Sequence, residues 1–301
     1  MYLKEVLFIL ELKKITLADR PLFESYLSRP DQRGSECAFT NLFVWQDCYG
    51  IYWTVVHDFL VIKVNRNEVD FFLQPFGGKD EDLPKLFAEI KEYHEGKPFE
   101  IHGIYDDGKE RLAKAFPEME FIEDRDNWDY VYLREKLASL SGRKYHGKKI
   151  ITMRLKKNIL IMFTNRSDQI ITKSARLLVM NGAKNVLAKT KACAVSNVLS
   201  MKRLIILKHL VCAAALSVST EKLKRSASVK KFNDDTAVLH VEKANPDIRG
   251  IYAAINKEFP NMHGGCSLFN REEDMGHEGL RTAKESYHPE FMIKKYSSVF
   301  K

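Results

Sequence analysis

The sequence predicts an α+β protein with mixed sheets, and three observations predict it. Runs rich in β-branched and aromatic residues alternate with amphipathic segments of helical period over 12–149. The same alternation resumes over 232–301. A chain of 301 residues has room for two domains, each with its own core. Strands and helices in this order suit mixed sheets that carry helices on their faces.

In the N-terminal part, caps, turns, proline and glycine mark where the predicted helices and strands begin and end. A short helix within 37–50 is expected to have Thr40 or Asn41 as its cap. The segment 51–64 contains two β-rich runs separated by a two-residue turn, which predicts a hairpin. The later elements are a helix that begins at Asp82 and Pro84 and stops at Gly96, a strand over 99–103, a helix over 107–116 and a strand over 129–133.

The C-terminal part contains three further elements. An alternating run over 236–241 predicts a strand. Apolar residues at helical spacing over 248–259 predict an amphipathic helix, and a second helix is expected over 276–286, before Pro289.

The middle segment, 150–231, has a composition unlike that of either flank. It contains 17 Lys and Arg but only two acidic residues, so its net charge is +15. The flanks hold 48 − 17 = 31 basic and 40 − 2 = 38 acidic residues, a net charge of −7. The segment has one aromatic residue, one glycine and no proline. The net charge of +8 for the whole chain is therefore a property of this segment and not of the fold.

Composition argues against several classes of function. The basic segment lacks the aromatic residues on which single-stranded nucleic acid stacks. The apolar run 204–219 is interrupted by Lys208 and is shorter than the roughly 20 residues of a membrane span. The run 6–12 contains Glu11 and does not resemble a signal peptide. We therefore expect no transmembrane segment.

The cysteines, the histidines and the absence of known catalytic motifs bear on the cellular setting, on metal binding and on the reaction class. The five cysteines include no C-x-x-C pair, which favours a reduced, cytoplasmic setting. The nine histidines lack metal-ligand spacing, so no metal is expected. No G-x-S-x-G, H-E-x-x-H, P-loop or G-x-G-x-x-G motif is present.

Three long stretches carry a family resemblance. They read DYVYLREKLASLSGRKYHGKK over 129–149, DTAVLHVEKANPDIRGIYAAINKEF over 235–259 and NREEDMGHEGLRTAKESYHP over 270–289. They resemble the family named for the C-terminal domain of phosphatidylglycerol lysyltransferase, and especially its stand-alone bacterial members of uncharacterised function. The upstream FTNLFVWQDCYGIYW and PFEIHGI fit the same family.

The resemblance implies two tandem domains with the acyl-CoA N-acyltransferase (GNAT)-like fold. The N-terminal copy, 12–149, would be intact. The second copy would keep only its C-terminal half, 232–301, and would be disrupted by the anomalous segment 150–231.

Family members continue after KYHGKK with an Asn-His motif and a Phe-Lys-Lys run, which this chain lacks. Residues 149–157 can be encoded by codons that, when read from the third base of each, give Asn-His-Tyr-Asn-Ala-Phe-Lys-Lys. The same shifted reading frame allows family-like peptides at intervals up to residue 231. This predicts a frameshift, with a base lost near Lys149 and a base gained near Lys231. The alternative is a genuine, divergent helical insertion, but the segment shows neither a clean apolar stripe nor a disorder-like composition.

The end of the strand at 236–241 is the first candidate site. His240 and Glu242 lie on one face by period two, and such a pair could deprotonate an attacking amine or hydroxyl. The alternative is a half-buried strand histidine followed by a capping Glu242. Lys243, at the end of the same strand, is a candidate substrate-binding residue. Arg249 and Asn256 are two more, at and beyond the start of the next helix, where an acyltransferase-like fold binds its donor.

The polar turn before the last helix and the junction after the first domain supply the other candidates. Acidic residues of the turn could bind the ammonium of an amino acid or stabilise the helix N-terminus. At the junction, ligand contact competes with a solvated basic linker. The candidate substrate-binding residues here are Asn270, Arg271, Glu272, Lys284, Tyr145, His146 and Lys148.

The resemblance implies transfer of an aminoacyl group from tRNA to an unidentified acceptor, with no bound cofactor. An acetyl-CoA donor is the alternative, although the expected pyrophosphate loop is not matched at 247–252. A different reading is a non-catalytic ligand- or protein-binding module. If the second domain is disrupted, this particular chain is expected to be inactive.

Overall fold

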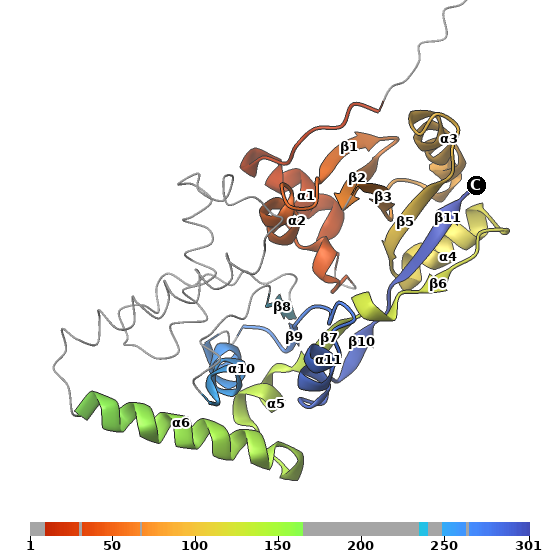
Figure 1. Ribbon diagram of the computed structural model, residues 1–301. Coiled ribbons are helices and arrows are strands. Elements are labelled where there is room, and N and C mark those ends of the chain that lie inside the picture. Colours follow the sequence, from red (N-terminus) through yellow and green to blue (C-terminus); the bar gives the residue numbers. More distant parts are fainter. Residues whose placement is uncertain (1–9, 30–31, 67, 165–234, 240–248, 263–264) are drawn as a thin grey trace, which may run out of the picture. The chain divides into compact units, whose positions relative to one another are not determined.

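The computed structural model describes residues 10–29, 32–66, 68–164, 235–239, 249–262 and 265–301 (Figure 1). These residues form two compact units that are each discontinuous in sequence. The first unit combines Met1–Asp129 with Glu273–Glu278 and Met292–Lys301. The second combines Tyr130–Glu272 with Gly279–Phe291.

Among its described residues, the first unit contains a seven-stranded mixed sheet with the order β1-β2-β3-β5-β11-β6, in which β4 also pairs with β2. The β3–β5 pair is parallel, whereas the β1–β2, β2–β3 and β5–β11 pairs are antiparallel. The strands are β1 (Tyr52–Val56), β2 (Phe59–Arg66), β3 (Val69–Leu73), β4 (Phe76–Gly77), β5 (Phe99–Ile104), β6 (Ile122–Glu123) and β11 (Tyr296–Phe300).

The predicted hairpin is confirmed, and its turn explains why it forms. His57 and Asp58 connect β1 to β2 with φ values of +49° and +59°. Two positive φ values match the twist of a two-residue hairpin turn, and His and Asp tolerate this region better than most residues. The predicted strands at 99–103 and 129–133 are likewise present, as β5 and β7 (Asp129–Leu133).

The helices of the first unit are α1 (Arg20–Leu27), α2 (Phe39–Trp45), α3 (Leu83–Tyr93) and α4 (Asp106–Ala115). The sequence predicted α2, α3 and α4, but the predicted cap of α2 was wrong. Its N-cap is Ala38, because the 3-10 turn Ser35–Cys37 leads directly into Phe39. Asn41 instead donates its side-chain N–H to the backbone oxygen of Ser35, 3.2 Å away.

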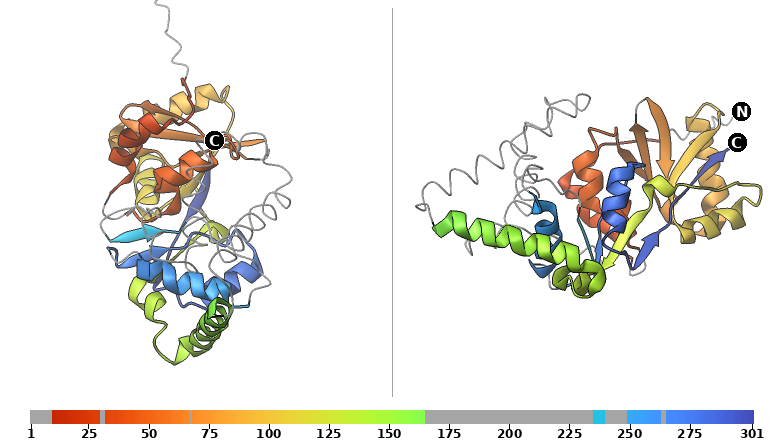
Figure 2. Two further views of the ribbon diagram at one scale, coloured as in Figure 1. Left: turned by 90° about the vertical axis from the view of Figure 1, so that its left-hand side faces the viewer. Right: turned by 60° about the horizontal axis from the view of Figure 1, so that its bottom comes forward.

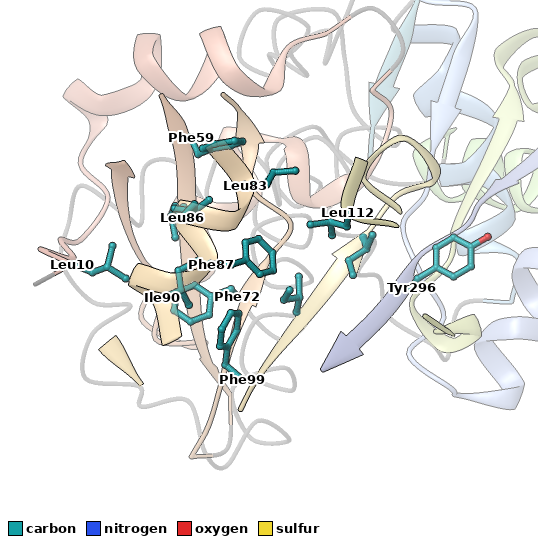
Figure 3. Packing of buried hydrophobic residues seen from close by; sticks show 13 residues of the cluster. Leu10, Phe59, Phe72, Leu83, Leu86, Phe87, Ile90, Phe99, Leu112 and Tyr296 are labelled. Carbon is teal, nitrogen blue, oxygen red and sulfur yellow. The ribbon is translucent and has the colours of Figure 1, made fainter. Parts of the chain in front are cut away.

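The core of the first unit lies between α3 and the sheet (Figure 3). Leu83, Leu86, Phe87 and Ile90 recur at helical spacing and bury one face of α3. The ring of Phe300, on β11, lies 5.0 Å from that of Phe87. The last strand of the chain is therefore part of this core.

Residues of the C-terminal part also belong to the sheet of the first unit. The sequence predicted a complete first domain over 12–149 and assigned 232–301 to the second. In the structure β11 lies between β5 and β6, so the sheet of the first unit is completed by the C-terminal residues. A long-range pairing of this kind leaves no local signal in sequence.

The second sheet has four strands among the described residues, in the order β10-β7-β9-β8. β9 pairs antiparallel with β7 and parallel with β8. The strands that join β7 are β8 (Thr236–Val238), β9 (Leu268–Asn270) and β10 (Phe291–Ile293). The predicted strand 236–241 thus begins as expected, and its residues 240 and 241 lie outside the described part.

The helices of the second unit are α5 (Arg134–Ser139), α6 (His146–Thr164), α10 (Ile251–Met262) and α11 (Glu278–Glu285). α10 packs against α5 and α6 (Figure 2). Gly250, at a φ of +91°, precedes α10, and a Cβ there would overlap the side chain of Ile151. The predicted helix at 248–259 is confirmed with this later start, and the predicted helix at 276–286 is confirmed as α11.

The first residues of the anomalous segment are part of this unit. α6 continues through the segment to Thr164, and the side chains of Thr152 and Leu155 are buried. Residues 165–231 lie outside the described part. Among the helices that the structure describes, none combines the length and apolar character of a membrane span.

Candidate functional site

The candidate site is built on β7 and the end of β9. Tyr130 and Tyr132 project to one face of β7 because side chains alternate along a strand. Beyond β9, the backbone N–H of Arg271 donates to the oxygen of Tyr130 at 2.9 Å, and the N–H of Tyr130 donates to the oxygen of Glu272 at 3.3 Å. The residues after β9 are thereby held alongside the Tyr130 position.

Asn270 shapes the turn that follows β9. Its buried side-chain oxygen accepts the backbone N–H of Glu272 at 2.6 Å, which is an Asx turn. Glu272 has a φ of +57°, so the chain reverses sharply after Arg271. The backbone oxygen of Asn270 also accepts the N–H of Leu239, the residue after β8, at 2.8 Å. Asn270 therefore fixes the turn rather than facing solvent.

Lys284 fixes the same turn from α11. Its side chain is only 6% exposed, and its ammonium donates to the backbone oxygens of Arg271 at 2.6 Å and Glu272 at 2.9 Å. The ammonium also lies 5.6 Å from the centroid of the Tyr130 ring. A buried ammonium must be hydrogen-bonded to offset its desolvation, and the two carbonyls provide this. Lys284 is thus a positioning residue for Arg271.

Arg271 places its guanidinium among aromatic rings. Its Cζ lies 5.4 Å from the centroid of Tyr132 and 5.1 Å from that of Tyr287, and the side chain is 7% exposed. A guanidinium over ring faces is held in a defined orientation by cation–π attraction. Guanidinium groups in general donate forked N–H groups to carboxylate or phosphate oxygens.

Lys148, in the first turn of α6, contacts the same ring from another element. Its Nζ lies 4.5 Å from the Tyr287 centroid. Partial burial, followed by the charge of Arg271, lowers the pKa of Lys148 below its usual value. Tyr145 supports this arrangement by donating its hydroxyl to the backbone oxygen of Tyr287 at 2.9 Å. Burial raises the pKa of that Tyr145 hydroxyl.

The structure joins six of the predicted substrate-binding residues in one set of contacts, three of them with Tyr287 and three with the turn after β9. These residues are Tyr145, Lys148, Asn270, Arg271, Glu272 and Lys284.

The other predicted residues are placed differently. The side chains of His146 and Arg249 are exposed. Asn256 is buried within α10, where its side-chain amide donates to the backbone oxygen of Tyr252 at 2.8 Å. His240, Glu242 and Lys243 lie outside the described residues. The proposed role of His240 and Glu242 therefore stays a prediction.

Sequence reasoning missed the three tyrosines that carry the cluster. Tyr130 and Tyr132 alternate along β7, and Tyr287 follows Lys284 by three residues. Those spacings place rings next to cations once β7, β9 and α11 are packed together. The signal was present but depended on a strand pairing that the sequence alone does not reveal.

The first unit contains a buried ionic cluster of a different character. The Lys295 ammonium lies 2.6 Å from a Glu36 oxygen, 2.8 Å from Asp129 Oδ1 and 3.3 Å from the Ser35 hydroxyl. Burial disfavours the charge on Lys295, but Asp129 and Glu36 outweigh it and raise the lysine pKa. Tyr105 donates its hydroxyl to the other Glu36 oxygen at 2.6 Å. The cluster thus places one buried ammonium between two carboxylates.

No group of three or more His, Cys, Asp or Glu side chains within the described ranges is arranged to hold a metal ion. The chemistry of the second-unit cluster is instead that of cations and phenols. Such groups bind and orient oxygen atoms of a ligand.

Comparison with known proteins shows the family to which this chain belongs. The family model described as phosphatidylglycerol lysyltransferase, C-terminal, matches residues 28–299 of this sequence. The chain belongs to this family. None of the curated proteins matches the sequence.

Two solved structures extend the comparison. A conserved protein of unknown function from Bacteroides thetaiotaomicron VPI-5482 is 30% identical, with a TM-score of 0.69; the match covers 97% of this chain and 99% of that chain. The structure of L-PGS from Bacillus licheniformis is 13% identical, with a TM-score of 0.54, and the match covers 95% of this chain and 92% of that one. The second likeness is one of fold alone.

Proposed function

We propose that this protein has the site of an aminoacyltransferase, which moves an aminoacyl group from tRNA to an acceptor nucleophile. Membership of the phosphatidylglycerol lysyltransferase C-terminal family is the observation that carries this proposal. The proposal includes the tandem acetyltransferase-like arrangement expected from sequence. An acyl-CoA donor is the alternative within the same reaction class.

The chemistry of the reaction assigns roles to the cluster. Attack of an acceptor amine or hydroxyl on the ester carbonyl creates an oxyanion, which preorganised donors stabilise. Arg271 supplies such donors and is oriented by the Tyr132 and Tyr287 rings. Lys284 keeps the Arg271 backbone in place. The general base is proposed to be His240 or Glu242.

A binding module without catalysis is the second candidate function. The converging groups whose contacts are described are an ammonium, a guanidinium and phenols. These bind ligand oxygens, and transfer additionally needs a base. Groups of this kind are sufficient for recognition.

The test follows labelled amino acid from aminoacyl-tRNA into a product other than free amino acid. It uses two chains, the present sequence and one in which 150–231 is replaced by the peptide of the alternative reading phase. We expect transfer by the second chain only, and its loss in Arg271→Met and in His240→Ala. The matched control is Arg143→Met, because Arg143 is an exposed arginine of the same unit.

The outcomes separate the two candidate functions. Transfer that is lost with Arg271 but kept in the Arg143 variant supports the aminoacyltransferase. If neither chain transfers any amino acid, while both retain a ligand that Arg271→Met no longer binds, the binding module is the correct function.

A further inference from the structure

Lys148 is a partly buried lysine that makes no ion pair with a carboxylate of the described residues. Its Nζ lies 4.5 Å from the centroid of the Tyr287 ring, which attracts an ammonium only weakly compared with a carboxylate. Lys136, on α5 of the same unit, has the ordinary arrangement, with its ammonium 2.6 Å from a Glu290 oxygen and its side chain 42% exposed. Lys148 has therefore lost part of its hydration without gaining a carboxylate.

The charges around Lys148 also disfavour its ammonium form. Lys148 lies in the first turn of α6, which contains no acidic residue. The positive end of a helix favours anions and disfavours cations. Burial, followed by the charge of Arg271, lowers the pKa of Lys148. At Lys136, by contrast, the hydrogen bond to Glu290 raises the pKa.

This setting has a chemical consequence for Lys148. Only a neutral amine has a lone pair with which to attack a carbonyl carbon. Enzymes that use lysine as a nucleophile activate it by removing it from water or by placing another cation beside it. Lys148 combines both conditions, and its side chain is only partly buried, so a small reagent can reach it from solvent.

We propose that Lys148 is a reactive lysine that is acylated by thioesters. The neutral Nζ attacks the carbonyl carbon, a C–N bond forms and the C–S bond breaks. The amine loses one proton, which leaves with the sulfur as a free thiol. The product is an uncharged amide, so the modification removes one positive charge from the first turn of α6. This step needs only Lys148 and its described surroundings, and it is independent of the proposed aminoacyl transfer.

The experiment treats the full chain at pH 7.5 with N,S-diacetylcysteamine, an uncharged thioester, under conditions of limited acetylation. Peptide mapping by mass spectrometry measures the initial rate at each lysine. Lys149 is the matched control, because it is the next residue and its side chain is exposed. Lys136 is the second control, since Glu290 holds its ammonium. A parallel reaction with acetyl-CoA separates reactivity of the amine from docking of the donor.

We expect Lys148 to be acetylated faster than Lys149 and Lys136 by both thioesters. The advantage should be at least about threefold, because the gain in the neutral form outweighs the lower nucleophilicity of a weaker base. Accessibility alone predicts the opposite order, since Lys149 is more exposed than Lys148.

A pair of glycine variants tests the cause of the reactivity. Gly147→Glu places a carboxylate in the first turn of α6, where a Cβ meets nothing within 4 Å. It should remove most of the advantage of Lys148 by stabilising its ammonium. Gly279→Glu, at a glycine of α11 with equally open space, should leave the Lys148 rate unchanged. Circular dichroism of both variants establishes that they are folded.

Three results would overturn the proposal. The first is acetylation of Lys148 that is no faster than that of Lys149. The second is a preference for Lys148 with acetyl-CoA alone, which would indicate docking of that donor and not a reactive amine. The third is a folded Gly147→Glu variant in which Lys148 keeps the parent rate.

Discussion

Lys295 and Asp129 form an ion pair whose side chains are both fully buried, with Nζ and Oδ1 separated by 2.8 Å. Asp129 begins β7, and Lys295 directly precedes β11, 166 positions later along the chain. Asp129 also accepts the backbone N–H of Ser35 at 2.7 Å and the Ser35 hydroxyl at 3.1 Å. Three distant segments of the first unit are therefore joined at one buried carboxylate.

Lys295→Met should unfold the first unit at a much lower urea concentration than the parent chain. Removing one partner of a buried pair leaves uncompensated charge and costs about 3–5 kcal/mol. Here two carboxylates, Asp129 and Glu36, would lose their cation. Urea titration followed by tryptophan fluorescence measures the change in the free energy of unfolding.

The control for that substitution is Lys294→Met. Lys294 is the neighbouring lysine, its side chain is 45% exposed, and it lies 3.4 Å from Glu123. An exposed pair contributes about 0–1 kcal/mol, so this variant should unfold close to the parent. Equal destabilisation of both variants would show that the buried cluster has no special weight.

The second prediction concerns the C-terminal strand. A fragment of residues 12–135 should fail to fold cooperatively, because its sheet lacks β11 between β5 and β6. A peptide of residues 292–301 added in excess should restore folding, since it supplies Tyr296 and Phe300 to the core. Circular dichroism and thermal unfolding, with and without peptide, measure this.

The peptide experiment has an internal control. A peptide with Phe300→Ser loses the ring that lies 5.2 Å from Phe99, and it should restore much less structure. Cooperative unfolding of the fragment without any peptide would contradict the discontinuous unit and favour the linear domain predicted from sequence.

The third prediction concerns pH. His94, just after α3, packs against the ring of Phe72 at 5.5 Å, and its buried Nε2 has no hydrogen-bond partner among the described residues. Burial, followed by the charge of Lys63, lowers the His94 pKa below 6.5; Lys97 acts in the same direction and Asp70 opposes it. The folded state therefore binds a proton less readily than the unfolded state.

The sign of the pH effect follows from that difference. The stabilisation is fully present above the unfolded pKa of about 6.5, and it is lost as the pH falls through the lower folded pKa. Urea titrations at pH 7.5, 6 and 5 should show declining stability, with a smaller decline in His94→Gln. An unchanged slope in His94→Gln would remove His94 as the cause.

Local elements of this fold were predictable because their signals are local. The apolar positions of α3 recur at helical spacing, and the His57–Asp58 turn separates two β-rich runs. The placement of β11 was not predictable, because a strand of five residues carries no information about which distant strands it joins. For the same reason, the sequence predicted Arg271 and Lys148 as site residues but not the Tyr287 ring that both of them contact.

The last prediction concerns the nucleotide sequence that encodes 150–231. This segment holds 17 of the 48 basic residues and two of the 40 acidic ones, and it lies within the range 28–299 that the family model matches. A loss of one base near Lys149 and a gain near Lys231 would produce such a boundary at each end and leave both flanks in frame. The DNA should then encode, in the alternative phase, an uninterrupted peptide with the aromatic residues, prolines and acids that the segment lacks. Sequencing the gene decides this, and stop codons scattered through that phase would identify the segment as a genuine insertion. If the phase is open, the restored chain should also resist limited proteolysis longer than the present chain does.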